Sequence, residues 1–186
     1  GGYACTSVTR KGVGFVIRMG IVGAGIMGRK YAALMKTDPR FEITAVYDKR
    51  EERANEFGQE LGVKVAPTLH DLLGEAIDAV YIATPDPFHA AIAIEAAKAG
   101  KHLLVEKPLA TTNEDAAAIA EAVANNAIKA QVSFCNRANI PFKRAFEIVK
   151  SGEIGEVLSI NGRLNDTLYV PTQMLQWASH STPAWF

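Results

Sequence analysis

The segment that most constrains the fold is the glycine-rich run GIVGAGIMGR at residues 20–29. Gly23, Gly25 and Gly28 have the G-x-G-x-x-G spacing, after an apolar run typical of a buried strand and before a segment of helical period. In such a unit the first glycine makes a tight turn, the second lets the backbone approach a pyrophosphate, and the third allows close packing of helix on strand. The run therefore predicts a dinucleotide site, in which the N–H groups at the start of the helix, at Ile26 and Met27, face the phosphates.

An acidic residue follows the next predicted strand. Asp48 ends the run FEITAVYD, 20 residues after Gly28. A carboxylate in this position accepts hydrogen bonds from the ribose hydroxyls of adenosine and repels a 2′-phosphate, which favours NAD. Lys49 and Arg50 would instead suit a 2′-phosphate if Asp48 turned away, so NADP remains an alternative. The readings without a ligand are a helix cap for Asp48 and a solvated face for the two bases.

The chain from Phe15 to Cys135 alternates short apolar runs with segments of helical period. This alternation predicts βαβ units around a doubly wound parallel sheet, an α/β Rossmann fold. The expected strands are 15–22, 41–47, 63–66, 77–83, 101–105 and 129–134, and the expected helices are 26–36, 50–61, 68–74, 87–99 and 113–126. Gly100 suits the end of one helix, and Thr111 and Thr112 suit the start of the next.

The pattern changes after Phe134. A helix is expected from near Pro141 to Ser151, followed by a strand at 157–164 with the alternation of an antiparallel sheet covered on one face. A single strand can neither pair its backbone nor bury a face. We therefore expect a tail at 1–14, a dinucleotide-binding domain at 15–135, and the incomplete start of a second α/β domain at 136–186.

Two later strands end in a second group of polar residues. One strand is followed by ATPD at 83–86, and the next by EKP at 106–108. Open α/β sheets bind their ligands at the carboxyl ends of the strands, where the strand order reverses. Charges are unusual beside buried parallel strands, so Glu106 and Lys107 indicate either a functional site or a structural ion pair.

Taken together, these segments resemble the Gfo/Idh/MocA oxidoreductases. The resemblance is carried by GIVGAGIMG, VYIATPDPFHAAIAIEAAKAGKHLLVEKPLATT and SGEIGEV, in this order, and it extends from Phe15 to Phe186. It implies hydride transfer between NAD or NADP and a sugar, cyclitol or related hydroxyl or carbonyl substrate. It also implies a second domain with an open antiparallel sheet, which binds the substrate and commonly forms the oligomer interface.

The resemblance also implies roles for single residues. Lys107 is the expected catalytic residue, beside the nicotinamide and the reacting hydroxyl, and Glu106 helps to position the nicotinamide end. A cis peptide before Pro108 would re-aim the lysine. His89 is expected either to contact the cofactor or to pack on the crevice wall, and Arg137 either to reach the cofactor or to lie on the surface. The expected cofactor-binding residues are Gly23, Gly25, Ile26, Met27, Gly28, Asp48, Lys49, Arg50, Ala83, Thr84, Pro85, His89, Glu106, Lys107 and Arg137.

The chain departs from the family pattern in one respect. The family's acid/base pair has a D-x-x-x-H arrangement, whereas the last histidine here, His180, has Gln176 four residues before it. One alternative is therefore a truncated nucleotide-binding module without turnover. Another is a structural partner that pairs the strand at 157–164 with a second subunit.

Composition limits the partners. Lys plus Arg and Asp plus Glu number 20 each, so no net charge favours nucleic acid or an anionic membrane. No apolar run approaches the roughly 18 residues of a membrane span, and residues 1–14 lack the pattern of a signal peptide. Two cysteines are too few for a disulfide scaffold or a metal cage. We expect a cytoplasmic enzyme with no metal, a small polyol or sugar substrate, and a homo-oligomeric full-length form.

Overall fold

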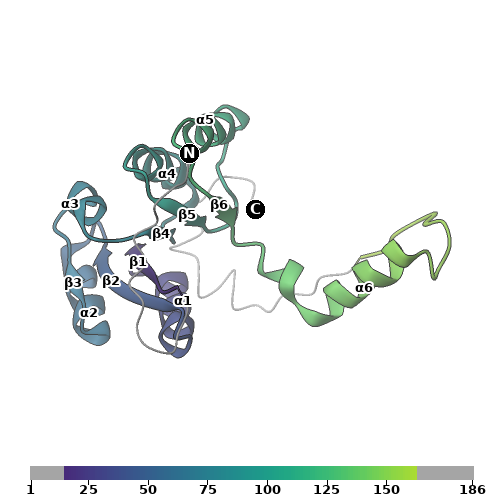
Figure 1. Ribbon diagram of the computed structural model, residues 1–186, viewed down its shortest axis with the longest axis horizontal. Coiled ribbons are helices and arrows are strands. Elements are labelled where there is room, and N and C mark those ends of the chain that lie inside the picture. Colours follow the sequence, from purple (N-terminus) through teal and green to yellow (C-terminus); the bar gives the residue numbers. More distant parts are fainter. Residues whose placement is uncertain (1–14, 163–186) are drawn as a thin grey trace, which may run out of the picture. The chain divides into compact units, whose positions relative to one another are not determined.

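The computed structural model describes residues 15–162, whose helices and strands are drawn in Figure 1. The chain divides into two compact units, of which the first ends at Val132 and the second begins at Ser133. The strands of the first unit are β1 (Ile17–Val22), β2 (Phe41–Tyr47), β3 (Lys64–Val65), β4 (Ala79–Ile82), β5 (His102–Val105) and β6 (Ala130–Val132). Its helices are α1 (Ile26–Thr37), α2 (Glu51–Leu61), α3 (Leu69–Gly74), the short 3-10 helix η1 (Asp86–Phe88), α4 (His89–Lys98) and α5 (Asn113–Asn125). The described part of the second unit contains the 3-10 helix η2 (Cys135–Ala138) and the helix α6 (Ile140–Ser151).

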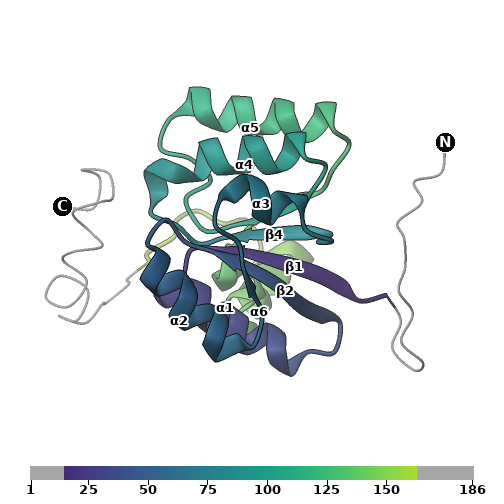
Figure 2. The ribbon, with the colours of Figure 1, turned by 90° about the vertical axis from the view of Figure 1, so that its left-hand side faces the viewer.

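The strands of the first unit form one parallel sheet in the order β3-β2-β1-β4-β5-β6. From β1 the chain adds β2 and β3 on one side of the sheet, and it then returns to place β4 on the other side of β1. The strand order therefore reverses between β1 and β4. This is the order of the doubly wound Rossmann fold. Figure 2 shows α1 and α2 on one face of the sheet and α3, α4 and α5 on the other. The expected α/β Rossmann fold is confirmed.

Helices cover both faces of the sheet, which explains why its strands are apolar almost without interruption. Met19 of β1 and Tyr81 of β4 pack in one cluster with Phe57 of α2. Val80 and Ile82, the neighbours of Tyr81 in β4, pack in the other cluster with side chains of α3, α4 and α5. Because side chains alternate along a strand, a single strand contributes to both halves of the core.

Local signals set the ends of several helices. The Thr112 hydroxyl accepts a hydrogen bond of 3.1 Å from the N–H of Asp115, so α5 begins with the cap that its sequence predicts. Gly100, just beyond α4, has a φ of 72°, and Gly152 ends α6 with a φ of 76°. Both values lie in the left-handed region that glycine adopts without a steric cost.

The strand expected at 157–164 is wrong over the part that the structure describes. Residues 157–162 form neither helix nor strand, and Leu158 and Ile160 are 89% and 87% exposed. Alternation of apolar residues is not sufficient for a strand, because a strand also requires a neighbour to accept and donate its backbone hydrogen bonds. The tail at 1–14, the last two residues of the expected strand and His180 lie outside the described residues.

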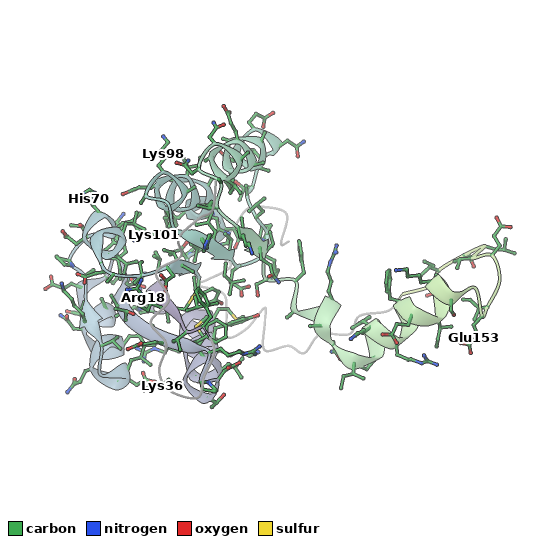
Figure 3. The ribbon with its side chains drawn as sticks, viewed as in Figure 1. Arg18, Lys36, His70, Lys98, Lys101 and Glu153 are labelled. Carbon is green, nitrogen blue, oxygen red and sulfur yellow. The ribbon has the colours of Figure 1, made fainter. Side chains whose placement is uncertain are left out.

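At the amino-terminal edge of the sheet an ion pair joins β1 to the residue before β4. The guanidinium of Arg18 donates to the Asp78 carboxylate from Nε at 3.0 Å and from Nη2 at 2.7 Å, and the Arg18 backbone N–H adds a bond of 2.9 Å. Lys101, labelled with Arg18 in Figure 3, donates to the carbonyl oxygens of Glu75 and Ile77. The hydrogen bonds from Arg18 lower the pKa of the Asp78 carboxyl. This edge lies opposite the carboxyl ends of the strands.

We expect Asp78→Asn to lower the free energy of unfolding by about 2 kcal/mol at neutral pH, since the charged hydrogen bonds to Arg18 are lost. A folded-state pKa below that of the unfolded chain means that this stabilisation is present above about pH 4 and is lost as pH falls through the folded-state pKa. Urea unfolding over a pH series measures the difference. Glu60→Gln, which removes the exposed partner of Arg29, is the control and should change little. A difference for Asp78→Asn that does not shrink in acid would contradict this account.

Candidate functional site

The glycine turn between β1 and α1 lies against the end of β4. Gly23 has a φ of 107°, and a Cβ atom there would lie 2.5 Å from the carbonyl oxygen of Ala83. A Cβ on Gly28 would collide with the carbonyl oxygen of Gly23. The backbone bond from Gly23 N–H to Tyr47 O, 2.8 Å long, ties the same turn to β2. Both glycines are therefore required by the protein's own packing.

Gly25 differs from the other two glycines of the motif. Its φ is −80°, which any residue adopts, and a Cβ built on it would meet, apart from its chain neighbours, no atom of residues 15–162 within 4 Å. Nothing in the described fold therefore demands a glycine at this position. The open space beside the backbone fits a ligand that must approach closely, as the pyrophosphate of a dinucleotide does.

The start of α1 provides hydrogen-bond donors at this turn. No side chain caps the helix, and its first turn contains no acidic residue. Ile26 and Met27, the first two helical residues, follow Gly25 directly. The first N–H groups of a helix have no partner within the helix, and the positive end of its macrodipole lies at the same place. The arrangement fits a phosphate.

Asp48 links the end of β2 to the glycine turn. Its Oδ2 accepts a hydrogen bond of 2.7 Å from the Ala24 N–H, and its Oδ1 accepts one of 2.8 Å from the Arg50 N–H. The helix cap considered from the sequence is not formed, because α2 has no side-chain cap and the second bond reaches only Arg50, the residue before the helix. The first bond was missed because it spans 24 residues. A carboxylate oxygen can accept a further hydrogen bond, so both oxygens retain capacity for ribose hydroxyls. Lys49 and Arg50 are exposed beside it.

The segment after β4 passes directly beside the glycine turn. The Ala83 N–H donates to Val22 O at 2.8 Å, which continues the pairing of β1 and β4 to the edge of the sheet. The next residue, Thr84, has a buried Oγ1 for which the described residues offer no hydrogen-bond partner. Pro85 follows and is half-buried. A buried hydroxyl without a partner is costly unless a ligand or water completes it.

The segment after β5 carries the EKP motif. Glu106 is buried, and its Oε1 accepts a hydrogen bond of 2.8 Å from the Tyr81 hydroxyl. Its Oε2 lies 3.3 Å from the backbone nitrogen of Lys107. The side chain of Lys107 is exposed, and the peptide bond between Lys107 and Pro108 is cis, as expected. Glu106 therefore anchors the backbone beneath the lysine.

Tyr81 was missed by the sequence reasoning because a tyrosine in a buried strand is indistinguishable there from an ordinary core residue. Its ring lies 4.9 Å from that of Tyr31. Burial and the nearby Glu106 carboxylate raise the pKa of the Tyr81 phenol well above its ordinary value. The phenol therefore stays protonated and donates to Glu106.

His89 lies behind the segments that follow β4 and β5. It is fully buried, with Nδ1 2.7 Å from Pro108 O and Nε2 2.8 Å from Thr84 O. The sequence left two alternatives for His89, contact with the cofactor or packing within the protein. Its burial agrees with the second alternative. Arg137 belongs to the second unit, where its guanidinium lies 5.3 Å from the centre of the Phe134 ring, and its role at the cofactor stays a prediction.

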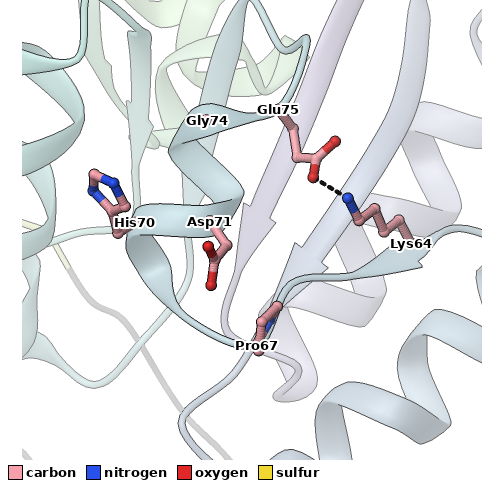
Figure 4. Close-up of a pocket in the computed structure, with 6 residues that line it drawn as sticks. All are labelled: Lys64, Pro67, His70, Asp71, Gly74 and Glu75. Atoms are coloured by element: carbon pink, nitrogen blue, oxygen red, sulfur yellow. Dashed lines mark hydrogen bonds and ion pairs between the residues drawn. The ribbon is translucent and has the colours of Figure 1, made fainter.

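A separate pocket lies between β3 and α3 (Figure 4). It has a volume of about 430 Å³ and is lined by Lys64, Pro67, His70, Asp71, Gly74 and Glu75. Lys64 and Glu75 form an ion pair across it. It shares no residue with the site predicted from the sequence.

The glycine turn, the acidic residue after β2 and the charged motif after β5 all lie at the carboxyl ends of the strands of one Rossmann sheet. These features define a nicotinamide-dinucleotide-binding domain of the oxidoreductase class. Residues 17–134 match the profile of the Gfo/Idh/MocA oxidoreductase family, described as an NAD-binding Rossmann fold. The chain belongs to this family.

Similar sequences and a similar solved structure agree with the family assignment. The chain is 31% identical over 163 residues to scyllo-inositol 2-dehydrogenase (NAD(+)) of Bacillus subtilis (strain 168), covering 86% of this chain and 48% of the relative. It is 32% identical over 172 residues to levoglucosan dehydrogenase of Pseudarthrobacter phenanthrenivorans, covering 87% and 44%. The crystal structure of scyllo-inositol dehydrogenase from Lactobacillus casei with bound NAD(H) and scyllo-inositol superposes with a TM-score of 0.71 at 31% identity, covering 76% of this chain and 43% of that one. The chain thus spans less than half the length of these three proteins.

We expect Gly25→Ala to leave the thermal unfolding midpoint unchanged and to weaken NAD binding at least about tenfold, because the added methyl group occupies open space that the pyrophosphate needs. Gly28→Ala is the matched variant. Its methyl group collides with the Gly23 carbonyl, so it should lower stability by roughly 1–3 kcal/mol. Calorimetry of binding and of unfolding separates the two effects. Undiminished NAD affinity in Gly25→Ala would place the pyrophosphate elsewhere.

We expect Tyr81→Phe to lower the free energy of unfolding by about 2 kcal/mol at neutral pH, because the buried Glu106 carboxylate loses its donor. The raised pKa of the Tyr81 phenol adds a pH dependence. Its stabilisation is fully present below the ordinary tyrosine pKa of about 10 and is lost as pH rises above it. Urea unfolding from neutral to alkaline pH tests this, with Tyr47→Phe, at the half-buried end of β2, as the control. Equal effects of the two variants would refute the role of the Tyr81 hydroxyl.

Proposed function

We propose that this chain supplies the cofactor half of an NAD(P)-dependent dehydrogenase, which transfers hydride between nicotinamide and a carbinol or carbonyl carbon of a sugar or cyclitol. The observation that carries the proposal is the placement of the glycine turn and the EKP lysine at the carboxyl ends of the strands, in the segments that follow β1 and β5. The names of the relatives, which include scyllo-inositol and levoglucosan dehydrogenases, support a polyol-like substrate.

Different residues near the reversal of strand order between β1 and β4 bind different parts of the cofactor. Gly25 and the N–H groups of Ile26 and Met27 bind the pyrophosphate, while Asp48 accepts hydrogen bonds from the adenosine ribose. Ala83, Thr84 and Pro85 line the nicotinamide ribose, and the buried Thr84 hydroxyl supplies a polar contact there. Residues from three segments, which follow β1, β2 and β4, thus hold the two ends of one ligand.

Lys107 is the catalytic residue of the proposal. Bound NAD would accept the hydride from the carbinol carbon, and the proton of the substrate hydroxyl would pass to water. The ammonium group of Lys107, on an exposed side chain, lowers the energy of an alkoxide developing on the substrate oxygen by direct electrostatic attraction. Glu106 holds the lysine backbone and is itself held by Tyr81. The rate advantage comes from orientation of the reacting carbons together with this charge.

Asp48 favours NAD over NADP in this proposal. Its carboxylate is held beside the glycine turn by the hydrogen bond from the Ala24 N–H. The carboxylate cannot rotate away from the adenosine ribose without breaking that bond. A 2′-phosphate placed there would meet its negative charge. The exposed Lys49 and Arg50 offset part of this repulsion, so the preference is a ratio of affinities.

The second unit is proposed as the beginning of the substrate-binding part. The described portion of α6 exposes Phe142, Phe146 and Val149, spaced so that they share one side of the helix. Such a face suits burial within a larger domain. Between residues 15 and 162, no helix combines the length and the apolar character needed to cross a bilayer.

Titration calorimetry with NAD and with NADP tests the cofactor half of the proposal, and hydride transfer to a panel of cyclitols and sugars tests the catalytic half. We expect micromolar affinity with NAD preferred. Binding without turnover by any polyol would support the alternative of a nucleotide-binding module. Failure to bind either dinucleotide would overturn the proposal for this chain.

Lys107→Ala should abolish turnover while leaving NAD affinity within a few-fold, because the ammonium acts on the substrate oxygen. Lys98→Ala, at the end of α4 and labelled at the surface in Figure 3, is the control and should retain both properties. Initial rates and calorimetry on the same preparations give the comparison. A large loss of NAD affinity in Lys107→Ala would make Lys107 a binding residue instead.

A further inference from the structure

The two loops that carry the proposed nicotinamide-end residues leave the sheet side by side. The ladder between β4 and β5 extends to a backbone bond of 2.9 Å from Glu106 N–H to Ile82 O. Beyond this bond the two segments are loops, and Thr84 and Lys107 lie just past the point where strand pairing ends. Something other than the sheet must therefore set their separation.

A single side chain spans the two loops at this point. The His89 ring contacts Thr84 O through Nε2 at 2.8 Å and Pro108 O through Nδ1 at 2.7 Å. The first carbonyl belongs to the loop after β4, and the second belongs to the loop after β5, one residue beyond Lys107. His89 itself is the first residue of α4, so the helix supplies a rigid base for the ring.

We propose that His89 is a positioning residue, which fixes the distance between the Thr84 loop and the Lys107 loop and thereby shapes the nicotinamide end of the crevice. The proposal rests on the function proposed above. His89 is fully buried, so it acts through the two backbone carbonyls and not by touching a ligand. Its two contacts join the segments after β4 and β5 just beyond the last backbone hydrogen bond between these strands.

The adenosine end of the site is held by different contacts. Gly23 N–H donates to Tyr47 O, and the Asp48 carboxylate accepts from Ala24 N–H. Neither contact involves the loops that His89 joins. Loss of His89 should therefore loosen one half of the crevice and leave the other half in place, which distinguishes positioning from general stability.

The loops of the ligand-free protein can be compared by amide hydrogen exchange. His89→Leu has an apolar side chain without ring nitrogens. In this variant we expect the backbone amides in 84–88 and 106–110 to exchange about tenfold faster. The amides in 20–28 and 41–48 should keep their exchange rates. His89→Gln retains an amide donor and should recover part of the protection. His70→Leu, at an exposed position of α3, is the control. Unchanged exchange in the two loops, or an equal increase throughout the domain, would overturn the proposal; if His89→Leu does not fold, the same comparison is made with His89→Gln.

A binding comparison separates this inference from the function on which it rests. NADH probes both ends of the crevice, whereas ADP lacks the nicotinamide ring and its ribose and probes the adenosine end alone. His89→Leu should weaken NADH binding about tenfold and change ADP binding less than about threefold. Equal losses for both ligands would overturn the inference while the proposed function stands. If the unaltered protein bound neither ligand, the proposed function would fail, and the exchange experiment alone would decide whether His89 joins the loops.

Discussion

The proposed cofactor site depends on how closely the glycine turn after β1 approaches the residues after β4. A Cβ atom on Gly23 would lie 2.5 Å from Ala83 O, and one on Gly28 would strike Gly23 O, so the turn exists in this form only because both side chains are absent. Its packing brings the amino-terminal end of α1 to the place where the strand order reverses. The empty space beside Gly25 is the result, and the proposed ligand uses it.

The amino-terminal and carboxyl ends of the strands hold different polar groups. The amino-terminal edge holds Arg18 and Asp78 in a pair with three hydrogen bonds, which is satisfied within the protein. At the carboxyl ends, the described residues offer no hydrogen-bond partner for the buried Thr84 hydroxyl, while the buried Glu106 carboxylate accepts from Tyr81. A buried polar group left with capacity is one that can recognise a ligand.

Much of the fold could be predicted because its signals are local. The alanine-rich segment before Gly100 and the capped segment after Thr112 form helices within two residues of the expected bounds, since caps and side-chain entropy act over one turn. The strand expected at 157–164 failed over its described residues because pairing is not a local property. For the same reason the contacts of His89 with the carbonyl oxygens of Thr84 and Pro108 were not predicted, nor was the hydrogen bond from Tyr81 to Glu106, which spans 25 residues.

The sequence by itself determined the doubly wound sheet, the glycine turn and the family, because glycine spacing and apolar period specify a backbone path that few other patterns share. Only the tertiary structure decided which glycine has open space beside its Cβ position, that Asp48 accepts a hydrogen bond from the Ala24 N–H, and that His89 is fully buried. These properties depend on distances between segments remote in the chain. Such distances are set when both faces of the sheet are packed, and no single segment encodes them.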